Sequence, residues 1–253
     1  MQVAAARDLG GDADWGARVV LLDPAKVRLL VRFDEETPRL ETWQRRYPAA
    51  LALLNGSFYS LDKKVRPTCD LVAAGKFEKG AGCRRPDALV LGAEGTSASE
   101  VARLLPLASF EPGKWREALK SFPSLVREGV PGCSGKLYCD QPSRCAAIAM
   151  LRDGRLALFA SQWPVVRRDV ALFLAGQLGA TWAVNLDGGP EATLWVKGQA
   201  LGEAIGTPGT PLPLVLVVEA RPQPVSPPLP AAVAAPPVGT VVGAPGPDAG
   251  LRR

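Results

Sequence analysis

Residues 181–197, TWAVNLDGGPEATLWVK, contain two apolar segments separated by a short polar loop. The first segment is rich in strand-forming residues and ends on Asn185 and Asp187. Residues two positions apart in a strand point to the same face, so this amide and this carboxylate leave the strand together. Gly188 and Gly189 follow directly, and they let the backbone turn and let a ligand approach closely. We interpret the stretch as a candidate reaction site; the alternative is a hairpin with an Asp-Gly turn.

The overall composition predicts one sizeable globular domain. A chain of 253 residues is long enough to bury a core. Its hydrophobic share of 47% and charged share of 22% are ordinary for a soluble globular protein. The net charge of +5 suits an anionic substrate, but no dense basic run occurs, so nucleic-acid binding is not expected. No apolar run reaches the roughly 18–20 residues of a transmembrane helix. Residues 1–16 lack the apolar core of a signal peptide.

Histidine is absent from the chain, which narrows the possible chemistry. Its absence excludes Ser-His-Asp and Cys-His catalysis within the chain, and every zinc site that uses histidine. Acid–base catalysis must therefore come from carboxylates, tyrosine, lysine or cysteine. We expect no cofactor and no metal site; calcium is compatible with the composition, but nothing in the sequence indicates it.

The five cysteines form no C-x-x-C pair, which argues against zinc ribbons and thioredoxin-like motifs. Our preferred pairing joins Cys69 to Cys83 and Cys133 to Cys139, each pair closing a loop that contains glycine. Such disulfides imply an oxidising compartment, whereas buried free thiols in a cytosolic protein are the alternative. We expect Cys145 to be buried or disulfide-bonded rather than nucleophilic, because no histidine is present to activate it.

Apolar patterns elsewhere predict more strands than helices. The expected strands are two within residues 17–33, broken at Asp23-Pro24, then 50–54, a strand before the Gly75-Lys76 turn, 87–91, 124–127, a hairpin over 144–161 around Arg152-Asp153-Gly154-Arg155, and 212–219. The expected helices are a main amphipathic one over 169–178 and short ones over 42–47, over 101–105 behind a capping-box pattern at Ser97 and Glu100, and over 114–120.

These elements predict an α+β fold with mixed, largely antiparallel sheets, one main amphipathic helix and a few short helices. We expect a lead-in over residues 1–16 and the folded domain over residues 17–220. Residues 221–253 are rich in proline and alanine, so we expect a flexible or extended tail there.

Five motifs occur in an order that resembles the phosphodiester glycosidase family. The resemblance covers about residues 17–219, and its most specific part is the last motif, which follows an apolar helix. The motifs are NGSFY at 55–59, FPSLVREG at 122–129, RCA at 144–146, RDGR at 152–155 and NLDGG at 185–189.

The resemblance implies hydrolysis of a sugar–phosphate diester, with release of the sugar and a phosphomonoester. It also implies an exported protein, secreted or periplasmic, which agrees with the disulfide interpretation. Carried over by motif, Asn55 and Gly56 line the pocket, Arg144 faces the phosphate, and Asn185 and Asp187 lie at the sugar. The same resemblance implies that Gly188 and Gly189 let the backbone approach the substrate. Without the resemblance, we interpret Arg144 as a solvated strand end, with binding of a phosphate or carboxylate as the alternative.

The chain departs from the family pattern at several of these positions. The family often has NGGFF and Arg-Thr-Ala, where this chain has Ser57, Tyr59 and Cys145. Small hydroxylated residues commonly follow the glycine pair, where this chain has Pro-Glu-Ala at 190–192, and Thr193 is the nearest hydroxyl.

Three functions remain open from the sequence. In the first, Asp187 is the base or nucleophile of an exported glycosidase, Arg144 binds the phosphate, and Glu191 is a second carboxylate. The alternative for Glu191 is a solvated loop charge. The second function is a non-catalytic envelope module that binds anionic glycans through the same pocket, which the altered loop after Gly189 suggests. The third is a structural role at the cell surface that depends on the proline-rich tail. The partner in the first two is a carbohydrate or phosphoglycan, and the oligomeric state is open.

Overall fold

A computed structural model describes residues 1–62, 64–97, 100–133, 139–198 and 204–222. The chain divides into two units, Met1–Arg221 and Pro222–Arg253, and the first contains every named helix and strand. The predicted tail over 221–253 lies outside the described residues except for Arg221 and Pro222. Among the described residues, no helix is long and apolar enough to cross a membrane.

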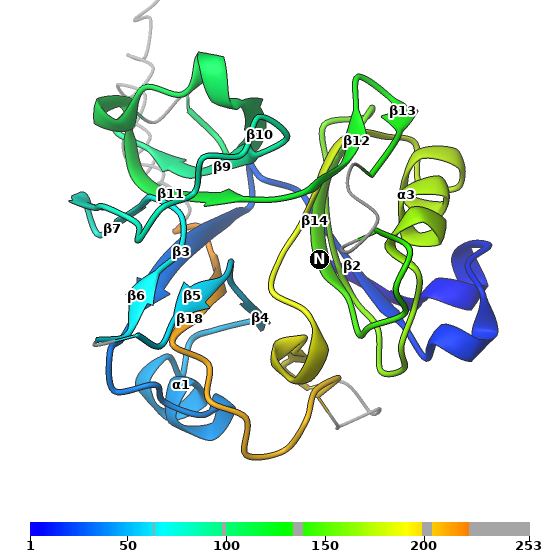
Figure 1. Ribbon diagram of the computed structural model, residues 1–253, viewed down its shortest axis with the longest axis horizontal. Helices are drawn as coiled ribbons and strands as arrows, with labels where there is room; N and C mark the ends of the chain where they lie inside the picture. The colour runs from blue at the N-terminus through cyan, green and yellow to red at the C-terminus, as the bar shows by residue number, and fades with distance from the viewer. Residues whose placement is uncertain (63, 98–99, 134–138, 199–203, 223–253) are drawn as a thin grey trace, which may run out of the picture. The chain divides into compact units, whose positions relative to one another are not determined.

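Three larger antiparallel sheets build the first unit (Figure 1). The seven-stranded sheet has the order β1-β2-β15-β14-β16-β12-β13. Its strands are Gln2–Ala5 (β1), Arg18–Leu22 (β2), Leu156–Ala160 (β15), Ala146–Leu151 (β14), Ala180–Asn185 (β16), Ser124–Arg127 (β12) and Val130–Pro131 (β13). Residues 1–16, the expected lead-in, thus contribute the edge strand β1, which pairs with β2.

The other sheets are smaller. The five-stranded sheet runs β10-β9-β11-β7-β8, the four-stranded sheet runs β17-β4-β18-β3, and β5 pairs with β6 alone. Their strands are Arg103–Pro106 (β10), Leu89–Gly95 (β9), Trp115–Ser121 (β11), Leu71–Ala73 (β7), Lys76–Glu78 (β8), Leu194–Val196 (β17), Ala52–Asn55 (β4), Leu214–Ala220 (β18), Val27–Phe33 (β3), Tyr59–Ser60 (β5) and Arg66–Pro67 (β6).

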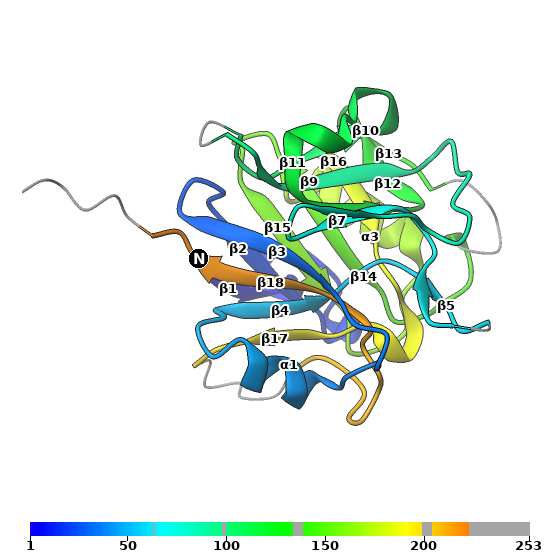
Figure 2. The same cartoon turned by 90° about the vertical axis from the view of Figure 1, so that its left-hand side faces the viewer.

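One central core lies between the three sheets. It is formed by alternate side chains of β2, β3, β9 and β14. Examples are Val20, Leu29, Leu91 and Ile148, each at most 1% exposed to solvent. The outer face of the seven-stranded sheet is covered by α3, Arg167–Gly176, and that of the four-stranded sheet by α1, Leu40–Arg46 (Figures 1 and 2). Because many strands are buried on both faces, their sequences read as nearly continuous apolar runs. The predicted α+β class is confirmed.

The predictions of helix at 101–105 and 114–120 are wrong, because both segments are strands, β10 and β11. A register shift between Trp115 and Ala118 marks a bulge where β11 pairs with β9. Across the bulge, Trp115 and Ala118 pack into one hydrophobic cluster although they are three residues apart, and Leu119 is buried in the central core. The apolar residues therefore have a spacing of three and four, which imitates a helix. Ser97 and Glu100 close a backbone turn instead of capping a helix. The predicted strands, the hairpin of β14 and β15, and the main helix are confirmed.

The hairpin interpretation of residues 181–197 is also wrong. β16 pairs with β14 and β12 in the seven-stranded sheet, whereas β17 pairs with β4 in the four-stranded sheet. The loop between them, which contains the 3₁₀ turn Gly189–Glu191, therefore passes from one sheet to another. A loop that crosses between sheets at the strand ends brings its polar residues to a shared edge.

The predicted disulfides Cys69–Cys83 and Cys133–Cys139 are both formed. Cys145 is the remaining cysteine, and it is a buried free thiol. Disulfides are typical of proteins that fold in an oxidising compartment.

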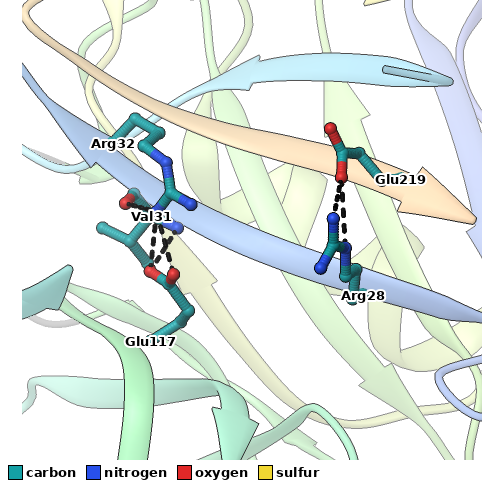
Figure 3. Close-up of polar contacts among 5 residues, drawn as sticks. All are labelled: Arg28, Val31, Arg32, Glu117 and Glu219. Atoms are coloured by element: carbon teal, nitrogen blue, oxygen red, sulfur yellow. Dashed lines mark hydrogen bonds and ion pairs between the residues drawn. The ribbon is translucent and has the colours of Figure 1, made fainter. Parts of the chain in front are cut away.

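A buried carboxylate joins two of the sheets (Figure 3). Glu117, on β11, accepts hydrogen bonds from the backbone N–H of Val31, at 3.0 Å, and from Nη1 of Arg32, at 2.9 and 3.0 Å. β3 is an edge strand of its sheet, so this N–H has no partner within the sheet on that side. Glu117 therefore accepts a hydrogen bond from a buried N–H of an edge strand and also forms an ion pair with Arg32.

We expect Glu117→Gln to lower the free energy of unfolding by about 2–3 kcal/mol, since it leaves Arg32 without its counter-ion in a largely buried position. Urea titration measures the change. Glu111→Gln is the matched control, because Glu111 forms an exposed ion pair with Lys114 at 2.9 Å, and its loss should cost less than about 1 kcal/mol. Equal effects of the two substitutions contradict the inter-sheet role of Glu117.

Candidate active site

The strand ends predicted to hold site residues do lie together. Asn55 ends β4, and its Nδ2 donates to the carbonyl oxygen of Asp187 at 2.8 Å. Its Oδ1 accepts from the backbone N–H of Thr193 at 2.9 Å, and its own N–H donates to the Thr193 carbonyl at 3.1 Å. The N–H of Asp187 donates to the carbonyl of Gly56 at 3.0 Å. Asn55 and Gly56 thereby hold both ends of the loop over residues 187–193.

Asn185 is fully buried and is used entirely by the protein. Its Oδ1 accepts from Nε of Arg167 at 2.9 Å and from Sγ of Cys145 at 3.4 Å, and its Nδ2 donates to the carbonyl of Leu186. Burial raises the pKa of the Cys145 thiol to about 12, against the opposing charge of Arg167. This thiol is therefore protonated at neutral pH, as its expected non-nucleophilic role requires. Asn185 therefore has a structural role: its buried side chain supports the site through contacts with the protein.

The glycine pair is required by two different constraints. A Cβ on Gly188 would lie 2.7 Å from the carbonyl oxygen of Arg144 and 2.8 Å from Nη2 of Arg167. Gly189 has a φ of +65°, which other residues rarely adopt, and its N–H donates to the same Arg144 carbonyl at 2.9 Å. The pair thus lets the loop lie directly against two arginines.

Asp187, Glu191 and Tyr59 form the titratable centre of the site. Burial, together with the negative charge of Glu191, raises the pKa of Asp187 to about 7, against the opposing effects of the Gly188 N–H and of Arg167. The Gly188 N–H donates to Oδ1 of Asp187 at 2.9 Å, and the Tyr59 hydroxyl donates to Oε1 of Glu191 at 3.2 Å. Burial and the charges of Glu191 and Asp187 raise the pKa of Tyr59, so it keeps its proton. A carboxyl group that titrates near neutrality is suited to acid–base catalysis.

Arg144 is half-buried beside this centre. Its guanidinium donates to the carbonyl of Ser161 at 3.4 Å, to the Thr207 hydroxyl and to the Ala192 carbonyl. Burial lowers the pKa of Arg144 and the charge of Glu191 opposes that shift. A guanidinium has five N–H donors, so two remain beyond these three contacts. Arg144 therefore holds the loop and keeps two N–H donors that can bind an anion.

Arg167, at the start of α3, is a residue that the sequence analysis missed. It is only 7% exposed, contacts Asn185 and Gly188, and places a positive charge near Asp187. The only signal in the sequence is an arginine pair at 167–168 ahead of the amphipathic helix, and such a pair usually marks a solvated helix end. The role of Arg167 is determined by its hydrogen bond from α3 to Asn185 at the end of β16.

Two cavities adjoin the loop. A small one, of about 10 Å³, is lined by residues that include Ser57, Tyr59, Asp187 and Glu191. A larger one, of about 720 Å³, is lined by Thr193 among others; it shares Leu212 with the small cavity and includes Thr207, the partner of Arg144. Of the sequence-predicted site residues, Asn55, Gly56, Asp187 and Glu191 line the small cavity and Thr193 lines the large one. Arg144, Asn185, Gly188 and Gly189 line neither cavity. Within the described ranges, no group of three or more carboxylate or cysteine side chains forms a metal site.

The large cavity has one exposed aromatic side chain that the sequence analysis did not single out. Trp163 is 57% exposed and lines this cavity. Its indole packs on Gly16, which has a φ of +53° and where a Cβ would lie 3.0 Å from the ring. The backbone N–H of Trp163 donates to the carbonyl of Trp15 at 3.2 Å.

Comparison with known families gives a match over most of this domain. The model of the family described as phosphodiester glycosidase matches residues 49–219, a range that includes both strand ends and the loop. The chain belongs to the phosphodiester glycosidase family. A search of curated proteins found no significant match.

Solved structures of three proteins share the fold of this phosphodiester glycosidase family member at low sequence identity. The catalytic domain of zebrafish N-acetylglucosamine-1-phosphodiester alpha-N-acetylglucosaminidase, auto-inhibited by its pro-peptide, is 17% identical, with a TM-score of 0.61 over 81% of this chain and 77% of that chain. A hypothetical protein from Synechocystis is 15% identical, with a TM-score of 0.56 over 81% and 59%. A Burkholderia pseudomallei protein whose description suggests export is 13% identical, with a TM-score of 0.57 over 80% and 73%.

We expect Asp187→Asn to stabilise the protein increasingly as the pH rises. In the folded protein Asp187 keeps its proton up to about pH 7, whereas in the unfolded chain it ionises near its ordinary value of 3.8. Its contribution to stability is therefore complete below pH 3.8 and is lost as the pH rises through 7. The variant should match the native protein at pH 4 and exceed it by about 1–2 kcal/mol at pH 8, after allowance for partial solvent exposure.

Urea titrations at several pH values measure this difference. Asp153→Asn is the control of opposite sign, because hydrogen bonds from Arg155 lower the pKa of Asp153 in the exposed β14–β15 turn. That variant should lose stability relative to the native protein above pH 4. A stability difference for Asp187→Asn that does not change with pH contradicts the raised proton affinity.

Proposed function

We propose that the protein is an exported glycosidase that hydrolyses a sugar-1-phosphodiester or a related glycoside of a cell-envelope glycan. The observation that carries this proposal is the Asp187 carboxyl group, whose pKa is raised to about 7 beside Glu191, on a loop of a phosphodiester glycosidase domain. An ionisation near neutrality lets one carboxyl group accept and release a proton under physiological conditions.

In the proposed mechanism, Asp187 is the general base. It removes a proton from the attacking water as the water oxygen bonds to the anomeric carbon, and the bond from that carbon to the phosphate oxygen breaks. The electron pair leaves with the phosphate, so the products are a free sugar and a phosphomonoester. The negative charge of Glu191 increases the basicity of Asp187 and stabilises positive charge that develops on the sugar ring.

Arg144 binds the phosphate in this proposal. Its two remaining N–H groups can donate hydrogen bonds to phosphate oxygens. Its contacts with Thr207 and Ala192 keep the guanidinium in position. The negative charge that leaves with the phosphate is thereby stabilised, so the leaving group needs little protonation. Neither step uses a metal ion.

The rest of the substrate would occupy the cavity of about 720 Å³, which has the size of a small-molecule site. The cavity that contains Asp187, at about 10 Å³, is too small for a sugar ring. Trp163 offers an exposed aromatic face for the apolar side of a sugar in the larger cavity.

Export is supported by the two disulfides and by the description of the Burkholderia relative. Of the zebrafish protein, the solved structure names the substrate bond, an N-acetylglucosamine-1-phosphodiester. We propose a bond of that class for this chain, with the sugar and the attached group left for the assay to identify.

A non-catalytic glycan-binding module is the second candidate. The observation that favours it is that the cavity large enough for a sugar is lined by neither Asp187 nor Glu191. Binding of a phosphoglycan without turnover across the substrate panel identifies this case.

We expect Asp187→Asn to lower the rate of hydrolysis at least about 100-fold, because the general base is lost. Purified protein is assayed against N-acetylglucosamine and other sugar-1-phosphodiesters and against aryl glycosides, with release of the phosphomonoester as the readout. The native kcat/KM should fall below about pH 7, where Asp187 takes up its proton. Glu191→Gln should lower the rate less and shift this pH profile to lower pH.

Asp153→Asn, in an exposed turn, serves as the matched control and should retain full activity. A chelator such as EDTA should leave the rate unchanged. Native activity in Asp187→Asn, or a pH profile that does not change with Glu191→Gln, contradicts the assigned roles.

We expect Trp163→Ala to raise KM about 3- to 10-fold with kcat nearly unchanged, since it removes an aromatic contact made equally in the ground and transition states. Steady-state kinetics on the best substrate measure both constants. Phe77→Ala is the control, because Phe77 is a similarly exposed aromatic residue, at 52%, on β8. A similar rise in KM for both variants contradicts a specific role for the cavity.

A further inference from the structure

The Ser57 hydroxyl is a buried polar group without a partner among the described residues. Ser57 is 2% exposed, and its Oγ makes no hydrogen bond. Buried hydroxyl groups nearly always have a hydrogen-bond partner, either from the protein or from ordered water, so this one needs an explanation. Ser57 is also one of the positions at which the chain departs from the family motif, where a glycine is frequent.

The cavity beside Ser57 has the size of a single water molecule. Its volume is about 10 Å³, which is close to the minimum that holds one water. A buried water needs two to four polar partners. The residues that line the cavity can supply them, because Asp187, Glu191 and Tyr59 carry polar side chains and line the same cavity as Ser57.

The groups around this cavity are held firmly in place. The N–H of Gly56 donates to the carbonyl of Leu214 at 2.7 Å, and the carbonyl of Gly56 accepts from the N–H of Asp187 at 3.0 Å. Ser57 follows Gly56 directly, so its backbone is tied to the same two segments. On the other side, the hydrogen bond from the Tyr59 hydroxyl orients Glu191. A water at this point therefore meets fixed partners.

We propose that Ser57 is a positioning residue that holds the attacking water against Asp187. The inference rests on the proposed glycosidase function and adds a residue to it. The water donates one hydrogen to the Asp187 carboxylate and the other to Oγ of Ser57, which leaves a lone pair free to attack. As the oxygen bonds to the anomeric carbon, its proton passes to Asp187 and the phosphate leaves with the electron pair of the broken bond. Ser57 itself forms no covalent bond.

Kinetics of Ser57 variants test the role. We expect Ser57→Ala and Ser57→Gly to lower kcat about 10- to 100-fold with KM within 2-fold, and Ser57→Thr, which keeps the hydroxyl, to retain more activity than either. Ser60→Ala is the matched control, because the Ser60 hydroxyl donates to Asp62 at an exposed position; it should match the native rate.

Competition between water and methanol gives a readout that a merely structural role would not change. With methanol present, the native protein should form mainly free sugar, and Ser57→Gly should form at least about 5-fold more methyl glycoside relative to free sugar, because the cavity is larger and the water is no longer held. A product ratio unchanged in Ser57→Gly, or a kcat unchanged in Ser57→Ala, overturns the role of Ser57 while leaving the proposed function intact.

A crystal structure of the native protein and of Ser57→Gly, without substrate, tests the water separately. We expect an ordered water within hydrogen-bond distance of Oγ of Ser57 and of the Asp187 carboxyl group in the native protein, and its loss or displacement in the variant. The absence of this water from the native crystal overturns the inference. A native protein that hydrolyses no substrate in the panel overturns the proposed function, and with it the catalytic role of the water, whatever the crystal contains.

Discussion

The candidate active site depends on one buried side chain, the amide of Asn55. It donates to the Asp187 carbonyl and accepts from the Thr193 N–H, so it joins the end of one strand to both ends of the crossing loop. A buried amide of this kind stabilises the fold only when its donors and acceptor are paired. The same contacts therefore fix the backbone that carries the Asp187 carboxyl group, without the help of a bound ligand.

The arrangement of the sheets explains why polar groups gather at this point. β16 and β17 are close in sequence but belong to different sheets around one core, so the chain must cross between them where the strands end. Backbone groups at such a crossing have no neighbour within a sheet, and the side chains of Asn55, Asn185 and Arg144 bond to them instead. A structural requirement of the crossing and a set of preoriented polar groups are thus satisfied by the same residues.

The proton affinity of Asp187 is set by opposing effects within a few residues. Burial and Glu191 favour the protonated form, whereas the Gly188 N–H and Arg167 favour the ionised form, and the balance lies near neutrality. Gly188 enters this balance twice, because its missing side chain also lets Arg167 approach the loop. Ser57 and Glu191, both departures from the family motif, border the same small cavity as Asp187.

The sequence alone determined the strands that alternate or run apolar, the amphipathic helix and the family, because each depends on residues near in sequence or on a motif. It favoured the disulfide pairing that the structure contains but left free thiols open. It also located Asp187 and Asn55 at strand ends. Only the tertiary structure decided that β11 is a strand, since its bulge spaces Trp115 and Ala118 as a helix would. The buried role of Arg167 and the shared cavity of Ser57 were likewise decided there, because burial and charge at these positions come from segments distant in sequence that meet only in the folded chain.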